Sequence, residues 1–330
     1  MTILDAIDRF LNYLSAGQSE RTVKTYETAL NRFREYLTEA DAPPLDTQVT
    51  QLTVDQAIDF VHWLLGEHFR GQEVPKSTLR TYLSSLSRFY NYLLRERLAE
   101  ISAADHQRMV DSYRDFRKGY HRPLPKLPPE EAVGELIAAA RSRQVDADHQ
   151  RARLRRLRDI AILEILRATG MRVGELVALR RGDLDYRNQA AIVHGKGNRE
   201  RLVYLDDRAW QAINVYLQAR QDGARGRALY QLPVVARHDR GAGKQVLPLS
   251  TNTIRRVFDD CRKLAGIEQP LTPHSLRHAF ATKVLEATGD LAIVQDLLGH
   301  SSPTTTRIYA KVTSRRLHEA HRRAFEYGKE

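Results

Sequence analysis

Arg172 stands in the segment ATGMRVGELVAL, shortly after a glycine and at the expected start of a helix. The free backbone N–H groups of a helix start attract anions, and a guanidinium adds paired hydrogen-bond donors. Both could therefore converge on one phosphate, although an arginine at such a position can also be an ordinary surface residue. Glu175 follows one turn later, and we expect it to orient Arg172.

The segment HSLRHAFAT holds a second group of polar side chains. His274 and Arg277 are three residues apart, so they share one helical face and could point at the same anion. His278 is four residues from His274, a spacing that could also bind a metal ion. No glutamate lies between the two histidines and no further ligand is evident nearby, so we expect no metal site. His278 is predicted to pack against the site or to support it from behind.

Two more segments place reactive residue types near glycines. Lys196 is expected at the tip of a hairpin of two short strands in AIVHGKGNRERLVYL, with Arg199 nearby as a candidate DNA contact. His300 follows a helix-ending glycine in LLGHSSPTTTRIYAKV, and Tyr309 comes shortly afterward in a helix begun by Pro303. Each of these residues alone is more often structural than reactive. Their combination with the two arginines gives a set that could act on a phosphodiester.

The set resembles the tyrosine recombinase, or phage integrase, family and its Xer-like members. The resemblance is carried, in this order, by Arg172, Lys196, His274, Arg277, His300 and Tyr309. The matching segments are ATGMRVGEL, HGKGNRERLVYL, LTPHSLRHAFAT and LLGHSSPTTTRIYAKV, and the stretch SERTVKTYETALNRFREYL resembles the family's N-terminal DNA-grasping domain. Six chemically suitable residues inside four motifs make the resemblance specific over nearly the whole chain.

The resemblance implies that Tyr309 attacks DNA and forms a 3′-phosphotyrosyl bond. A phenol with a pKa of about 10 is a poor nucleophile at neutral pH, and the phosphodiester anion repels attack, so positive charge must neutralise both groups. Arg172 and Arg277 would clamp the two non-bridging oxygens and bind the transition state most tightly. His274 and His300 would complete the contacts to these oxygens.

The remaining chemistry is proton transfer, in which the resemblance gives Lys196 the role of protonating the departing 5′ oxygen. His274 would help to deprotonate or position Tyr309. Resealing would need no ATP, because the tyrosyl ester preserves the energy of the broken bond. The chain also lacks a phosphate-binding P-loop, since GAGKQ has neither the upstream glycine nor the Ser or Thr. We therefore expect no metal and no nucleotide cofactor.

Four prolines in GYHRPLPKLPP, residues 119–129, hold the backbone extended and predict a linker between two domains. Residues 1–118 are predicted to form a helical core-binding domain with a SAM-like bundle. Residues 130–330 are predicted to form the catalytic domain, mainly α with a small β-sheet, and to end in a tail helix. Helices of this domain are expected at 159–168, 251–265, 274–288, 290–298 and 303–310.

The first domain shows two apolar helical stripes, one in the segment that Ser19 is expected to cap and one in a helix from about Ser77. The other face of this second helix carries side chains that could grip DNA phosphates or could simply be solvated. These candidate DNA contacts are Arg80, Ser84, Arg88 and Arg95.

The formal net charge of +11 points to a polyanionic partner, because basic surfaces gain affinity by releasing counterions from phosphates. The excess lies after residue 118, where 37 Lys and Arg face 24 Asp and Glu. A single cysteine, Cys261, excludes an internal disulfide and is expected to be a small core residue. No apolar run is long enough to span a bilayer, so we expect a cytoplasmic protein.

Two charged segments, Arg141 to Arg158 and Gln221 to Gln245, are predicted to lie outside the core as exposed loops or helix extensions. They are also where the sequence departs from the family. If they lie near bound DNA they could add phosphate contacts, and they could equally be solvated.

The implied partner is double-stranded DNA with paired inverted half-sites, bound by a homotetramer that exchanges strands through a Holliday junction. Accessory DNA-bending or recombination proteins are possible further partners. The tail Val312 to Glu330 has an amphipathic pattern and is expected either to dock on a neighbouring protomer or to fold back on its own domain. Two alternatives stay open, a type IB topoisomerase and a DNA-binding protein without catalysis.

Overall fold

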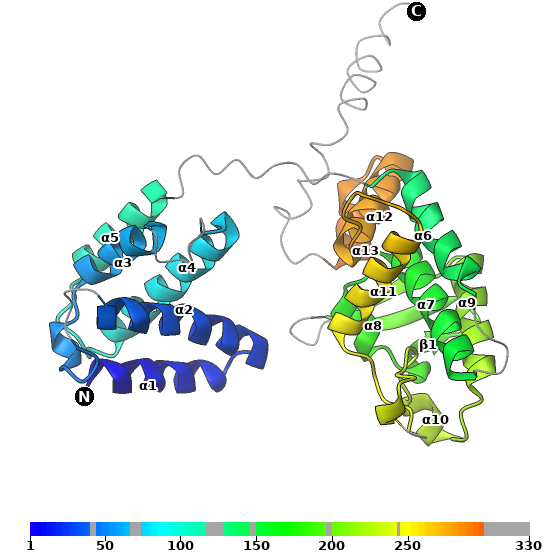
Figure 1. The fold of residues 1–330 in the computed structure, drawn as a ribbon, viewed down its shortest axis with the longest axis horizontal. Coiled ribbons are helices and arrows are strands. Elements are labelled where there is room, and N and C mark those ends of the chain that lie inside the picture. Colours follow the sequence, from blue (N-terminus) through cyan, green and yellow to red (C-terminus); the bar gives the residue numbers. More distant parts are fainter. Residues whose placement is uncertain are drawn as a thin grey trace, which may run out of the picture. The chain divides into compact units, whose positions relative to one another are not determined.

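The computed structural model describes residues 1–39, 44–66, 74–116, 128–144, 150–195, 200–242 and 245–299. The chain divides into two compact units, Met1–Arg122 and Pro123–Glu330 (Figure 1). Most of the predicted linker lies outside the described residues, so its boundaries stay a prediction. No helix among the described residues is long and apolar enough to cross a membrane.

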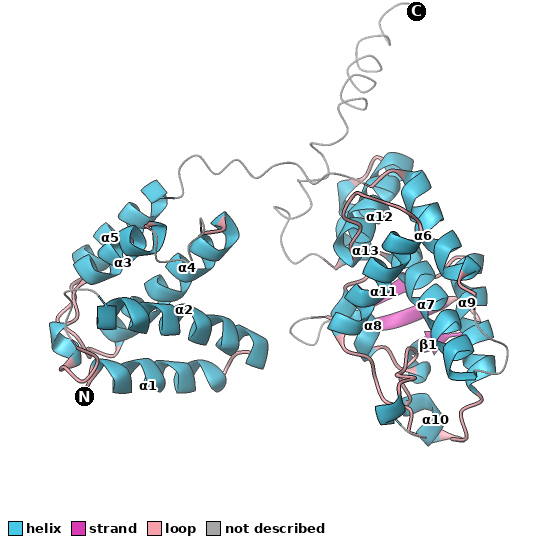
Figure 2. Ribbon diagram, viewed as in Figure 1, coloured by secondary structure: helices cyan, strands magenta, loops and turns pink. Residues whose placement is uncertain are grey.

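The described part of the first unit is helical (Figure 2). Its elements are α1 (Ile3–Ser15), α2 (Glu20–Glu39), a 3-10 turn (Val49–Gln51), α3 (Val54–Leu65), α4 (Lys76–Arg95) and α5 (Ala103–Phe116). The predicted cap of α2 is present, because the backbone N–H of Thr22 donates to Oγ of Ser19 at 3.3 Å. Both predicted apolar stripes face the interior of this unit.

Aromatic rings fill the centre of the first unit. Phe33 and Phe60 meet edge to face with ring centroids 5.4 Å apart, and Phe10 and Phe89 pack at the same separation. All four rings are fully buried. Rings at such edge-to-face and tilted geometries pack favourably, and the apolar faces of α2 and α4 contribute to this core while their polar faces lie outside.

The second unit is mainly helical and contains a small sheet (Figure 2). Its helices are α6 (Glu130–Ser142), α7 (Gln150–Thr169), α8 (Val173–Ala178), α9 (Asp207–Arg220), α10 (Arg227–Gln231), α11 (Thr251–Leu264), α12 (Pro273–Thr288) and α13 (Leu291–Leu298), with 3-10 turns at Arg181–Asp183 and Arg240–Ala242. The strands are β1 (Leu184–Asp185), β2 (Ala190–His194) and β3 (Glu200–Tyr204).

Helix α7 runs through the middle of the second unit and packs against α6, α9, α11 and α12. Residues from Ala161 to Leu166 are buried without a break, so this stretch has no solvent face. A stretch without a solvent face must be surrounded by other elements, and its one charged residue, Glu164, is paired with Arg141 and Arg167. The chain leaves α7 directly into the segment that contains Arg172.

The strands form an antiparallel sheet in the order β1-β2-β3, which adds one short strand to the predicted hairpin. Ile192 of β2 pairs with Leu202 of β3, and His194 pairs with Glu200. Because side chains alternate along a strand, Val193 and Val203 point into the core while their neighbours face outward. Arg201 therefore lies on the same face of β3 as Val203.

The prediction that Arg141 to Arg158 lies outside the core is wrong for its end, since α7 begins at Gln150 and Arg158 is 6% exposed. The guanidinium of Arg158 is buried because it donates to Oδ1 of Asp159 through Nε at 2.9 Å and Nη2 at 2.7 Å. The same prediction is wrong for part of Gln221 to Gln245. There Val234, Val235 and Ala236 are fully buried. Burial of their apolar side chains is favourable because it removes apolar surface from water.

Candidate active site

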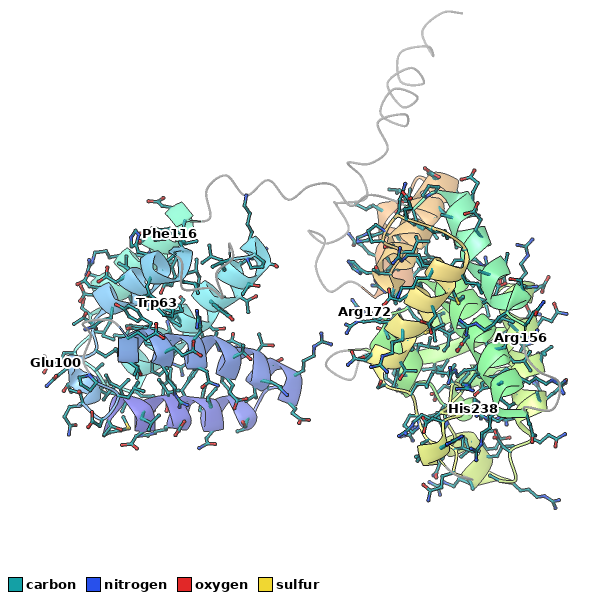
Figure 3. The ribbon with its side chains drawn as sticks, viewed as in Figure 1. Trp63, Glu100, Phe116, Arg156, Arg172 and His238 are labelled. Carbon is teal, nitrogen blue, oxygen red and sulfur yellow. The ribbon has the colours of Figure 1, made fainter. Side chains whose placement is uncertain are left out.

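Arg172 lies in the break between α7 and α8 (Figure 3). Gly170 turns the chain there with a φ of 57°, and a Cβ at this position would lie 2.6 Å from Cδ1 of Phe280. The Arg172 side chain is 47% exposed, yet its Nη1 donates to Oε1 of Glu175 at 2.9 Å. The backbone N–H of Arg172 donates to Oε2 of the same carboxylate at 2.8 Å. Glu175 thus holds both ends of an accessible arginine.

Arg277 lies in the first half of α12, a helix that begins with Pro273 and is capped by Thr272. In contrast to Arg172 it is buried, with 3% of the residue exposed. Its Nη1 donates to the carbonyl of Gly170 at 2.7 Å, and its Nη2 donates to the carbonyl of Leu298 at 2.8 Å. These bonds fix the guanidinium between the segment that carries Arg172 and the end of α13.

The two histidines of α12 lie against each other. The ring centroids of His274 and His278 are 4.2 Å apart with an angle of 72° between the ring planes. His274 is exposed and His278 is half-buried, so the ring of His278 supports that of His274 from the inner side. Within the described ranges no group of His, Cys, Asp or Glu residues has the arrangement of a metal site.

Arg201 is a residue that the sequence analysis missed. Its Nη1 and Nη2 donate to Oε1 and Oε2 of Glu175, both at 2.9 Å, and its Nε donates to the carbonyl of Leu297 at 3.0 Å. Burial alone would raise the pKa of the Glu175 carboxyl, but the hydrogen bonds and charges of Arg201 and Arg172 bring that pKa below its usual value. Glu175 is therefore a carboxylate at neutral pH.

A signal for Arg201 was present in the sequence. In RERLVYL, Arg201 alternates with Val203, so a strand places both on one face. A charged side chain on the core-facing side of a strand needs a buried partner of opposite charge. The partner could not be identified, because Glu175 is 26 residues away in the chain.

The structure brings the four motifs of the sequence together through two arginines. Arg277 joins its own motif to Gly170 and Leu298, while Arg201 joins the hairpin motif to Glu175 and Leu297. The first of these contacts spans 107 residues of the chain. Three backbone carbonyls and one carboxylate are thus held by two planar, permanently charged groups, an arrangement that suits precise positioning.

Four predicted site residues lie outside the described residues, namely Lys196, Arg199, His300 and Tyr309. The structure does describe the elements that flank them. Strands β2 and β3 end on either side of residues 196–199, and α13 ends at Gly299 with a φ of 62° directly before His300. A Cβ at Gly299 would lie 2.9 Å from Cδ of Arg201, so the chain passes close to that arginine before it reaches His300.

The candidate DNA contacts of the first unit lie on one helix. Arg80, Ser84, Arg88 and Arg95 are all exposed on α4. Arg88 donates through Nη1 to the hydroxyl of Tyr26 at 3.3 Å, with its guanidinium 5.5 Å from the ring centroid. This contact orients Arg88 without removing its charge from the surface.

Comparison with known proteins finds the same two parts of the chain. Residues 130–316 match the Phage integrase family, and residues 7–97 match the phage integrase N-terminal SAM-like domain. Tyrosine recombinase XerD of Pseudomonas putida is 34% identical over 317 residues, which cover 96% of this chain and 95% of the relative. Tyrosine recombinase XerC of Pelotomaculum thermopropionicum is 32% identical over 326 residues, covering 96% and 97%.

A solved structure with a similar fold is the XerH site-specific recombinase bound to palindromic difH substrate in a post-cleavage complex. It aligns with a TM-score of 0.70 at 18% identity and covers 97% of this chain and 95% of that one. At this identity the likeness shows the fold alone.

Proposed function

The chain belongs to the phage integrase family of tyrosine recombinases, and on that premise we propose that Tyr309 is the nucleophile with which it cuts and rejoins DNA at specific sites. The reaction would proceed through a 3′-phosphotyrosyl intermediate and a Holliday junction. It would serve the integration or excision of a mobile element or the resolution of replicon dimers.

The meeting of the four motifs at Arg277 and Arg201 is the observation that carries this proposal. A protein that only binds duplex DNA needs basic side chains on its surface and no buried arginine that ties distant segments together. Here the guanidinium of Arg277 is bound to the backbone on both sides of the proposed site. The arrangement is suited to a reaction in which small errors of geometry reduce the rate strongly.

Arg172 and Arg277 have different surroundings and would contribute differently. Arg172 is accessible and would reach the phosphate from solvent, guided by Glu175. Arg277 is buried and would present a fixed charge, so it needs little reorganisation when negative charge builds up on the non-bridging oxygens. Both oxygens would be neutralised in the transition state more fully than in the ground state, which is the requirement for catalysis.

The proposed step is a transesterification in which atoms and charges balance. The oxygen of Tyr309 forms a bond to phosphorus while the bond from phosphorus to the 5′ oxygen breaks. His274 would take the phenolic proton, Lys196 would give a proton to the 5′ oxygen, and His300 would help to hold the phosphoryl oxygens. The reverse reaction with a 5′ hydroxyl reseals the strand without metal or nucleotide.

We assign Arg201 a positioning role that acts through Glu175. Its bidentate pair with Glu175 leaves one edge of that carboxylate for Arg172, and its Nε holds the last turn of α13. Residues that orient a charged catalytic group commonly change its effect by one to two orders of magnitude when they are lost, as seen around metal ligands. Arg201 would thus help set the position of Arg172 and of the chain leading to His300.

We further propose that the enzyme works as a homotetramer on paired inverted half-sites in the cytoplasm. The two units would be domains that bind the duplex together, with residues 119–129 as the linker and α4 contributing Arg80, Ser84, Arg88 and Arg95 to phosphate contacts. Arg199 near the hairpin tip would add a further contact. Accessory DNA-bending proteins would be required only where the target site demands a fixed geometry.

A trapping experiment with Tyr309→Phe tests the proposal. A nicked substrate that loses a short 5′ fragment after cleavage makes the covalent complex accumulate, and denaturing gels then count the adducts. We expect the wild-type chain to form adducts and Tyr309→Phe to form none while it binds the same DNA with similar affinity. The missing hydroxyl removes the attacking atom and leaves the arginine clamp unchanged.

The matched control is Tyr230→Phe, which removes an exposed phenol of the same unit that plays no part in the proposal. This variant should form adducts at the wild-type rate. Persistence of adducts in Tyr309→Phe would show that another residue is the nucleophile.

A further inference from the structure

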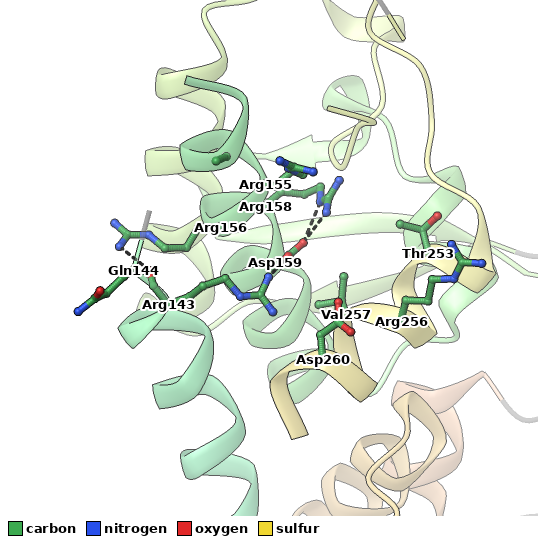
Figure 4. A pocket seen from close by; sticks show the side chains of 11 residues that line it. Arg143, Gln144, Arg155, Arg156, Arg158, Asp159, Thr253, Arg256, Val257 and Asp260 are labelled. Atoms are coloured by element: carbon green, nitrogen blue, oxygen red, sulfur yellow. Dashed lines mark hydrogen bonds and ion pairs between the residues drawn. The ribbon is translucent and has the colours of Figure 1, made fainter. Parts of the chain in front are cut away.

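The second unit contains a cavity of about 480 Å³ lined by the end of α6 and parts of α7 and α11 (Figure 4). It lies toward the start of α7, whereas Arg172 follows the end of that helix. At 1.5 Å per residue, the 13 residues from Arg156 to Thr169 separate the two sites by about 20 Å. The cavity is therefore distinct from the proposed active site.

Arginine dominates the wall of this cavity. Arg143, Arg155, Arg156, Arg158 and Arg256 line it, together with the carboxylates of Asp159 and Asp260. Among the described lining residues, five guanidiniums against two carboxylates leave a surplus of three positive charges around one cavity. Like charges brought this close repel each other unless an anion compensates them.

Partners within the described part of the chain account for only part of this charge. Asp159 is paired with Arg158 and accepts a weaker bond from Nη1 of Arg143 at 3.3 Å. Arg156 donates through Nη1 to the backbone carbonyl of Arg143 at 3.3 Å, which neutralises no charge, and its Nε is buried without a partner. Arg155 and Arg256 form no hydrogen bond or ion pair with the other residues drawn around the cavity (Figure 4).

The backbone adds to the positive potential of the cavity. Ala152 in the first turn of α7 and Thr253 in the first turn of α11 both line it. These helices contain 20 and 14 residues, and the positive ends of their dipoles are near these turns. Guanidiniums from two helices and two helix starts thus act on the same volume.

We propose that this cavity binds a small polyphosphate anion, either inorganic or the phosphate chain of a nucleotide. Guanidiniums are matched to phosphate because they offer paired donors and keep their charge at every physiological pH. A ligand with about three negative charges would balance the surplus of the wall. The volume is in the range of small-molecule and cofactor sites.

A duplex is a poorer fit than a small anion. DNA presents its phosphates on a convex surface and is bound mainly by exposed basic side chains. The side chain of Arg158 is only 7% exposed and lies inside the wall of the cavity. A phosphate of an intact DNA duplex does not reach it there. A compact anion can enter the cavity and approach guanidiniums from several directions.

Titration calorimetry of the full chain with inorganic pyrophosphate tests the proposal, followed by titration with a nucleoside triphosphate. We expect one saturable site per chain. Arg155→Gln and Arg256→Gln should each weaken pyrophosphate binding by about tenfold, the effect of losing one charge-assisted contact. Tighter binding of the nucleoside triphosphate than of pyrophosphate would identify a nucleotide site. Equal affinities of the two would show that the cavity recognises the phosphate chain alone.

Arg153→Gln and Arg255→Gln are the matched controls, because they remove the same charge from α7 and α11 at exposed positions that do not line the cavity. They should leave pyrophosphate affinity within about twofold, since exposed charges are screened. Arg172→Ala should also leave it unchanged, which separates this cavity from the active site. Melting temperatures of all variants should match that of the wild type.

Equal losses in the four Gln variants would overturn the proposal, because they would show general attraction of an anion to a basic protein. Loss of binding in Arg172→Ala would overturn it by placing the anion in the active site. Weaker duplex binding with unchanged pyrophosphate binding in Arg155→Gln and Arg256→Gln would show that these arginines contact DNA instead.

Discussion

The two units of the chain differ in what they bury. Among the described residues of the first unit, the buried core is apolar and aromatic, with Ser85 as its polar member. Among the described residues of the second unit five charged residues are buried as a whole. They are Arg158, Asp159, Glu164, Glu175 and Arg277. Both units contain one large apolar cluster, so the difference is not a shortage of apolar residues in the second.

Buried charge is costly, because each ion loses its hydration and needs close partners to compensate. A unit that does not have to hold distant chain segments at fixed distances can avoid this cost, and the described residues of the first unit include no buried charge. The second unit accepts it where Arg277 and the pair of Glu175 with Arg201 hold separate chain segments at fixed distances. The comparison indicates that fixed geometry is built into the second unit.

Of the variants considered, Arg277→Lys should reduce the cleavage rate most strongly, because it disturbs the fixed geometry of the second unit. Lysine keeps the positive charge but cannot span the carbonyls of Gly170 and Leu298 with one planar group. We expect the single-turnover cleavage rate to fall by about 100-fold to 1000-fold, the range found when one transition-state donor is lost. DNA affinity should change by less than about threefold.

A loss of affinity as large as the loss of rate would contradict this assignment. It would mean that Arg277 contributes to binding of the ground state as much as to the transition state.

Arg201→Gln should have the next largest effect. It removes the bidentate pair with Glu175 and the bond to Leu297, so Arg172 and the end of α13 lose their common support. We expect cleavage to slow by about 10-fold to 100-fold while DNA binding is retained. The cleavage rate of this variant should also be determined on a second substrate, in which sulfur replaces the bridging 5′ oxygen. The departing sulfur needs no proton.

That substrate separates positioning of the arginine clamp from positioning of the proton donor. If the sulfur substrate restores the rate of Arg201→Gln fully, the defect lies at Lys196 and not at Arg172. Arg187→Gln, at an exposed arginine between β1 and β2, is the control and should cleave both substrates at the wild-type rate.

The double variant Arg80→Gln and Arg88→Gln tests the first unit and should change DNA affinity without changing the cleavage rate. Both side chains are exposed on α4, so their loss should weaken DNA binding by a few-fold at physiological salt and lower the salt dependence by about one ion per lost contact. The cleavage rate of the DNA that is bound should stay the same. A slower rate at saturating protein would give α4 a part in the geometry of the site.

His238→Asn should have the smallest effect. It should change only how the free energy of unfolding depends on pH. Burial, followed by the charges of Arg158 and Arg220, lowers the pKa of His238 from 6.5 to about 4. Its Nε2 lies 2.8 Å from the hydroxyl of Tyr216. Between pH 6.5 and 4 the unfolded chain binds a proton that the folded chain does not, so the free energy of unfolding decreases as the pH falls.

Denaturant unfolding at pH 7 and pH 5 measures this decrease. His238→Asn should unfold at a midpoint that changes less between the two pH values than that of the wild type. An equal change in both proteins would mean that other groups carry the pH dependence.

Sequence reasoning identified the helices around the site because their apolar periodicity is local. The stripe of α4 and the helix around Arg277 begin within one or two residues of the expected positions. Cys261 is the buried core residue that was expected.

Sequence reasoning failed where burial depends on a partner from elsewhere in the chain. Charge density suggested that Arg158 is exposed, but pairing with Asp159 and contact with the carbonyl of Ala236 allow it to be buried. Arg201 was not recognised for the same reason, since its partners come from other motifs. Apolar periodicity predicts one helix or strand at a time. The side chains of Arg158 and Arg201 are positioned by residues from other parts of the chain.

Identification of the residue that is joined to DNA tests the central claim most directly. The covalent complex formed on the nicked substrate would be digested, and the peptide that retains a nucleotide would be sequenced by mass spectrometry. We expect a single modified peptide containing Tyr309, with phosphorus on its phenolic oxygen. A nucleotide attached to any other residue would contradict it.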